Sequence, residues 1–257
     1  MSLLDTALIS ENLWLLGIGL FAAMTLCARL GARLRQAGGT ERDGEGGGEG
    51  YLLSAALALL GLLIAFTFSL ALNRYDTRRA LVVTEANAIS TTWLRAELAG
   101  ESSGTELQRA IADYTDVRLK LPAAEDNAES VEVETVKAQA KLWADMRAAI
   151  RDAPPPVAAT IVTATNEMFD VASARKAERI ARVPGRVIEV LILYAMMSAA
   201  IVGYVLGGSG GKHRVVTTIL FALLTLALLL ILDLDRPWSG GITVSQQPML
   251  DARAAMR

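Results

Sequence analysis

The feature that most constrains this fold is an uncharged apolar run that continues into a charged segment with no helix breaker between them. Residues 51–72 read YLLSAALALLGLLIAFTFSLAL. At about 1.5 Å per helical residue, this run can cross a hydrocarbon core of roughly 30 Å. NRYDTRRA follows at once, without Gly or Pro. The sequence therefore predicts a membrane span that continues as a helix into water.

Three more apolar runs have the length of a membrane span, so four spans are predicted. The runs occupy residues 12–30, 51–72, 187–206 and 215–232. Hydrocarbon offers the backbone no hydrogen-bond partner, and each run is therefore expected to be helical. The first run lacks a basic leader and is followed by Arg29 and Arg33, which favours a retained span over a cleaved signal peptide.

The charged segment between the second and third spans predicts a helical domain outside the membrane. Its expected helices occupy about 105–121, 130–152 and 157–183. Apolar residues recur there at helical spacing, and no strand is expected. Thr105 and Gln108 form a capping-box pattern that predicts a helix start. Val133, Val136 and Met146 are among the predicted inward positions of the second helix.

The predicted fold class is an all-α integral membrane protein with four transmembrane helices and an extramembrane helical domain. Its expected parts are the first span with a Gly/Glu-rich linker (1–50), the second span (51–72), the helical domain (73–185), the third and fourth spans (186–235) and a C-terminal tail (236–257). The linkers around 31–50 and 207–211 are rich in glycine, which predicts flexible connections and not folded domains.

Composition excludes several classes of function. The chain is 53% hydrophobic and 20% charged, which suits a membrane protein with a large water-exposed part. Its net charge of -2 gives no support for a nucleic-acid partner. Cys27 and His213 are the only residues of their kinds, which excludes an intrachain disulfide and a zinc site built from cysteines and histidines. We expect no catalytic residues, no metal site and no cofactor, and hence no enzyme.

A stripe of residues along the second span predicts a channel constriction. Ala58, Leu62 and Phe66 recur every four residues and so share one helix face, and Ser69 and Asn73 continue it. An apolar ring that widens into polar side chains is typical of a hydrophobic gate. The alternative is that these side chains face lipid or neighbouring helices, and periodicity alone favours that alternative.

Charged residues follow the second span at the membrane border. The candidates for a vestibule are Arg74, Tyr75, Arg78 and Arg79. If several subunits brought these side chains together, the positive potential would concentrate anions. The alternative is that the arginines snorkel to the interface and form local ion pairs, including pairs with Asp76.

Two acidic residues end the fourth span. Asp233 and Asp235 could bind a cation or an arginine of a partner at the membrane edge. The commoner role of such residues is to cap the exit from the bilayer, with Trp238 as an interfacial anchor. We expect the structural role.

Basic residues give conflicting indications of membrane orientation. The two linkers carry Arg29, Arg33, Arg35, Arg42, Lys212 and Arg214. By the positive-inside rule, they place the helical domain outside the cell. The flanks of the helical domain are also basic, which favours the opposite orientation. The sequence leaves both orientations open.

Two segments carry a resemblance to a known family. GLLIAFTFSLALNRYDTRRALVVTEANAISTTWLRAEL resembles a family of four-span membrane proteins described as bestrophin-like. LDLDRPWSGGITVSQQPMLDARAAM resembles the closing segment of that family. Together with the matching arrangement of spans, the resemblance covers nearly the whole chain.

A more distant resemblance to bestrophins proper implies a function. Bestrophins are pentameric anion channels whose second helix lines the pore, with an apolar neck followed by a basic and aromatic stretch. The resemblance places Ala58, Leu62 and Phe66 at the neck and Arg74 and Tyr75 after it, although Ala58 is smaller than the usual neck residue. It also implies a cytoplasmic helical domain. The acidic calcium-binding cluster of bestrophins has no clear counterpart, so calcium gating is not expected.

The leading hypothesis is therefore an anion channel or anion-permeable pore formed by a homo-oligomer, with a pentamer expected. The protein would be a multi-pass protein of the inner or plasma membrane, with lipid and small anions such as chloride as its other partners. The alternative is a non-conducting membrane sensor or scaffold whose helical domain docks a protein partner.

Overall fold

A computed structural model describes residues 13–37, 46–121, 128–207, 213–236 and 241–256. Of these residues, 91% are helical and none lies in a strand, which confirms the all-α prediction. The chain divides into two compact units. The membrane unit comprises Met1–Asn73, Arg182–Arg236 and Gly240–Ile242. The helical unit comprises Arg74–Ala181, Pro237–Ser239 and Thr243–Arg257.

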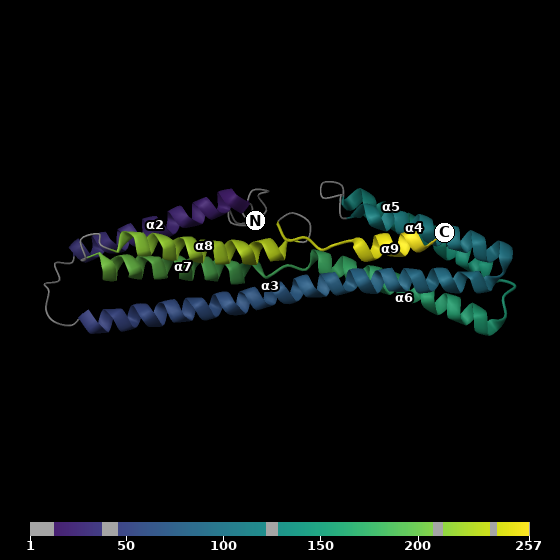
Figure 1. Cartoon of the computed structure of the whole chain (residues 1–257), viewed down its shortest axis with the longest axis horizontal. Coiled ribbons are helices and arrows are strands. Elements are labelled where there is room, and N and C mark those ends of the chain that lie inside the picture. The colour runs from purple at the N-terminus through teal and green to yellow at the C-terminus, as the bar shows by residue number, and fades with distance from the viewer. Residues whose placement is uncertain (1–12, 38–45, 122–127, 208–212, 237–240, 257) are drawn as a thin grey trace. The chain divides into compact units, whose positions relative to one another are not determined.

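The membrane unit contains the four predicted spans. Its helices are α2 (Leu13–Ala37), the first part of α3 (Gly46–Ala96), α7 (Gly185–Leu206) and α8 (Arg214–Asp235). In the described part of the chain, four helical stretches have the length and hydropathy to cross a bilayer, which confirms the predicted number of spans. Figure 1 shows α2, α7 and α8 packed alongside one another.

Glycines let α2 and α7 approach until their backbones touch. A Cβ atom added at Gly31 of α2 would overlap the carbonyl of Ala200 in α7, and one at Gly203 of α7 would overlap the carbonyl of Ala28. Small residues allow such close packing in membranes, where association depends on van der Waals contact and not on the hydrophobic effect. Helices α2 and α7 are therefore closely packed against each other in the membrane unit.

Helix α3 is continuous over 51 residues, as expected from the absence of a breaker after the second span (Figure 1). Within the membrane unit, Leu60, Thr67 and Ala71 are buried. Their separations of about two and three helical turns place them on one face. The hydroxyl of Thr67 donates to the carbonyl of Leu63, so this polar side chain is satisfied within its own helix.

The helical unit is built from the rest of α3 and four further helices. These are α4 (Glu101–Lys120), α5 (Ala128–Ala149), α6 (Pro155–Ile180) and α9 (Gln247–Ala255), with a short 3-10 helix at Glu97–Ala99. Its core includes Ile111, Tyr114, Met146 and Met168, all fully buried or nearly so. Met249 of α9 is also fully buried, so the C-terminal segment is part of this core.

The predicted start of α4 was wrong. The helix begins at Glu101, directly after Gly100, whose φ of 104° lies in the region that glycine tolerates best. The hydroxyl of Thr105 donates to the carbonyl of Glu101 inside the helix and does not cap its end. The 3-10 turn and the Gly100 conformation therefore set the boundary, and not the capping-box pattern.

The predicted inner face of α5 was also wrong in part. Val133 and Val136 are 49% and 56% exposed, whereas Val131 and Leu142 are buried. Met146 is buried as predicted. The helix carries apolar residues on more than one face, and contact with neighbouring helices decides which face is inside.

Candidate functional site

The residues of the predicted neck share an exposed face of α3. Leu62 is 49% exposed and Phe66 is 66% exposed, and Ala58, Ser69 and Asn73 are exposed as well. The buried face of α3 in this unit lies on the other side of the helix, because positions 60, 67 and 71 differ from the neck positions by about half a turn. Within the described part of the chain, no neighbouring helix therefore buries this stripe.

Two of the predicted vestibule arginines bind the C-terminal end of α6. Arg74 forms an ion pair with Glu178 at 3.3 Å. Arg78 is only 6% exposed and donates to the carbonyls of Glu178 and Ala181 at 3.4 and 3.2 Å. The last carbonyls of a helix have no partner within the helix, and the Arg78 guanidinium supplies donors for this end of α6. These two side chains have an evident structural role.

The other members of the predicted vestibule remain more accessible. Arg79 is exposed and Tyr75 is half-buried. Asp76 is exposed too, and it lies three residues beyond Asn73 on the face that carries Phe66. Only local ion pairs were predicted for Asp76 from the sequence, although its helical spacing from Phe66 indicates that it extends the stripe. The exposed side chains next to the stripe therefore carry both positive charge (Arg79) and negative charge (Asp76).

The acidic residues at the end of α8 hold backbone segments. The two carboxylate oxygens of Asp233 accept hydrogen bonds from the amides of Gly241 and Ile242 at 2.9 and 3.1 Å. Asp235 accepts one from the amide of Val183 at 2.9 Å. This geometry favours the expected structural role. Within the described residues, no cluster of three or more acidic, histidine or cysteine side chains could hold a metal ion.

A buried charge cluster lies inside the helical unit. Glu85 of α3 is fully buried and accepts hydrogen bonds from Arg118 of α4 at 2.6 Å and from Arg175 of α6 at 2.5 Å. Arg175 also donates to the side chain of Gln246, just before α9. The cluster therefore ties α3, α4, α6 and the C-terminal segment together. The cluster was not predicted from the sequence, although Glu85 falls among apolar positions of the buried face of α3.

The environment of the cluster keeps Glu85 ionised. Burial alone would raise the pKa of Glu85, but the charges of Arg118 and Arg175 outweigh burial and hold that pKa below its ordinary value of 4.5. Burial also raises the pKa of the nearby Tyr114 to about 12, so the phenol is neutral at physiological pH. The cluster carries one negative and two positive charges at neutral pH.

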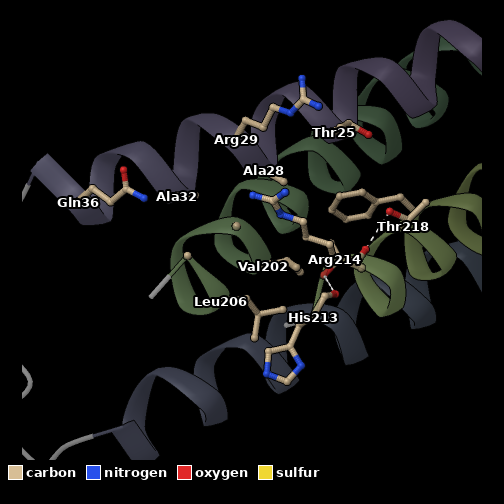
Figure 2. A pocket seen from close by; sticks show the side chains of 14 residues that line it. Thr25, Ala28, Arg29, Ala32, Gln36, Val202, Leu206, His213, Arg214 and Thr218 are labelled. Carbon is tan, nitrogen blue, oxygen red and sulfur yellow. Dashed lines mark hydrogen bonds between the residues drawn. The ribbon is translucent and has the colours of Figure 1, made fainter. Parts of the chain in front are cut away.

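A cavity of about 410 Å³ lies in the membrane unit, between α2, α7 and α8 (Figure 2). Its polar lining comes from Thr25, Arg29, Gln36, His213, Arg214, Thr217 and Thr218, and the rest of the lining is Ala28, Ala32, Val202, Gly203, Leu206, Gly207 and Phe221. None of the described residues that line it is acidic. In the sequence, Arg29 and Arg214 were interpreted only as markers of orientation, because the sequence does not show that α2 and α8 meet.

The helical content and the four candidate spans make this chain an all-α membrane protein with an additional helical unit. The family model of the bestrophin-like domain matches residues 19–249, and the chain therefore belongs to the bestrophin-like family. This confirms the family assignment made from the two sequence segments. Neither a curated protein nor a solved structure matches the chain.

Proposed function

We propose that this protein forms a passive pore for small anions in the cell membrane, built from several copies with the exposed stripe of α3 around a shared axis. The observation that carries the proposal is the order of side chains on this face. Leu62 and Phe66 are large, apolar and exposed, and Ser69 and Asn73 follow them on the same face. A ring of the first two disfavours water and hydrated ions, and the next two offer polar contacts.

Membership of the bestrophin-like family supports the same function, because bestrophins proper line their pore with the second helix. The proposed anion preference depends chiefly on Arg79. Arg74 and Arg78 are engaged with α6, and the exposed Asp76 opposes a positive potential on the stripe. Arg79→Glu should therefore reduce anion preference, and Asp76→Asn should increase it.

The first prediction concerns assembly. The purified protein should be a homo-oligomer, because a closed ring of α3 helices is needed to enclose a path. A pentamer is the expected state, because the chain resembles the pentameric bestrophins. Light scattering in mild detergent and mass photometry in nanodiscs would measure the particle mass. A uniform monomer in both media would contradict the pore.

The second prediction concerns conduction. Leu62→Ala with Phe66→Ala should increase anion flux into proteoliposomes several-fold, because the smaller side chains widen the apolar ring and admit water. The matched control is Leu223→Ala on α8, which also removes a large exposed apolar side chain (59% exposed). Equal effects of both changes, or no flux through the wild-type protein, would refute the proposal.

A second candidate function is that of a non-conducting scaffold or sensor, and one observation favours it. Val133 and Val136 place exposed apolar surface on α5 of the helical unit, which a protein partner could cover. The mass and flux measurements separate the two functions. An oligomer without flux would favour the scaffold, whereas flux that responds to Leu62 and Phe66 would favour the pore.

A further inference from the structure

Among the described residues, the lining of the cavity between α2, α7 and α8 carries positive charge and no acidic side chain. Arg29 and Arg214 are both exposed, and neither side chain forms an ion pair or hydrogen bond within the described part of the chain. Figure 2 shows the Arg214 side chain directed from α8 toward α2, whereas the Arg29 side chain lies along α2 and its guanidinium points away from Arg214. The Arg214 guanidinium would gain charge-assisted hydrogen bonds from an anion in the cavity, and Arg29 adds a second positive charge to the lining.

Arg35, another arginine of the membrane unit, has a structural role and provides a comparison with Arg29 and Arg214. Arg35, also on α2, forms an ion pair with Glu49 at 2.6 Å. It donates as well to the carbonyls of Tyr204 and Val205 at 3.1 and 3.2 Å, near the end of α7. Arg29 and Arg214 have no such partners and are not needed to join these helices.

The first turn of α8 adds to the attraction for an anion. Helix α8 begins at Arg214, and the first amides of a helix lack acceptors within it. The helix dipole also favours negative charge at this end. The hydroxyls of Thr217 and Thr218 donate to the carbonyls of His213 and Arg214, so the donors left for a ligand are the amides and the guanidinium groups.

We propose that this cavity binds the phosphate headgroup of an anionic glycerophospholipid. It lies where α7 ends and α8 begins, at the end of two membrane spans, and half of its lining is apolar. Its volume of about 410 Å³ is many times the roughly 30 Å³ occupied by a water molecule. A bare phosphate ion would leave most of it unfilled, whereas a headgroup with its glycerol and upper acyl carbons would match both its size and its mixed lining. Basic pockets between membrane helices bind such headgroups.

The test uses the full-length protein, delipidated in detergent, with phosphatidylglycerol, phosphatidylcholine or inorganic phosphate added at equal concentration. Native mass spectrometry counts the retained lipid, and thermal unfolding reports stabilisation. Wild-type protein should retain phosphatidylglycerol in preference to phosphatidylcholine, and inorganic phosphate should stabilise it much less. Arg214→Gln should weaken phosphatidylglycerol binding by about tenfold, through loss of a charge-assisted hydrogen bond, and Arg29→Gln should weaken it less, through loss of a positive charge at the cavity.

The matched control is Arg33→Gln, which removes an exposed positive charge from α2 outside the cavity. It should leave lipid retention unchanged. An equal loss for Arg33→Gln would show general attraction to the basic surface and overturn the site. Equal retention of the two lipids by the wild-type protein would overturn it without any variant. Equal stabilisation by inorganic phosphate would overturn the assignment to a lipid.

Discussion

Glu85→Gln is expected to lower the free energy of unfolding by about 3–5 kcal/mol, the usual cost of removing one partner from a buried ion pair. Gln keeps the shape of the side chain but not its charge. Arg118 and Arg175 would then face each other in the core of the helical unit without an anion between them. Thermal or denaturant unfolding of the full-length protein in detergent, followed by circular dichroism, would measure the loss.

The control for this change is Glu134→Gln. Glu134 also forms an ion pair, with Lys120 at 2.9 Å, but both side chains are about half exposed. An exposed pair contributes about 0–1 kcal/mol, because water and salt screen it. Similar losses for the two variants would show that the buried cluster is not what stabilises the helical unit.

The same cluster predicts a dependence on acid. The pKa of Glu85 in the folded protein lies below its ordinary value of 4.5. The stabilisation is therefore fully present above about pH 4.5 and is lost as the pH falls through the folded pKa. The difference in unfolding midpoint between wild type and Glu85→Gln should be large at neutral pH and should shrink below pH 4.5.

Gly203→Val is expected to prevent correct packing of the membrane unit. A Cβ atom at this position would overlap the backbone of α2 at Ala28, and backbone cannot rotate away as a side chain can. Overpacking that side chains can absorb costs about 1–3 kcal/mol, and a backbone clash exceeds this range. We expect most of the variant protein to aggregate on extraction, measured as the monodisperse fraction in size-exclusion chromatography.

Gly19→Val provides the matched control for Gly203→Val. A Cβ atom at Gly19 of α2 would have no neighbouring atom within 4 Å. The two variants add the same side chain to a membrane helix, so they differ only in what that side chain meets. A normal monodisperse fraction for Gly203→Val would refute the close α2–α7 contact.

Hydropathy alone determined the four spans, because a bilayer requires long uncharged runs and forces them to be helical. The absence of Gly and Pro after residue 72 likewise predicted the continuous α3 helix. Leu107, Ile111 and Tyr114 lie three or four residues apart and are all fully buried on one face of α4, as the helical spacing of apolar residues in this segment predicts. These features depend on local sequence, and so they could be predicted from it.

Only the tertiary structure decided which charged residues have partners. Arg78 binds carbonyls about a hundred positions away along the chain, whereas Arg79, the next residue, stays exposed. Glu85 of α3 likewise pairs with residues far away in the sequence, Arg118 of α4 and Arg175 of α6. The cavity with Arg29 and Arg214 exists because glycines bring α2 and α7 together beside α8. An ion pair or a cavity depends on distances between segments far apart in sequence, and helical periodicity within one segment carries no information about them.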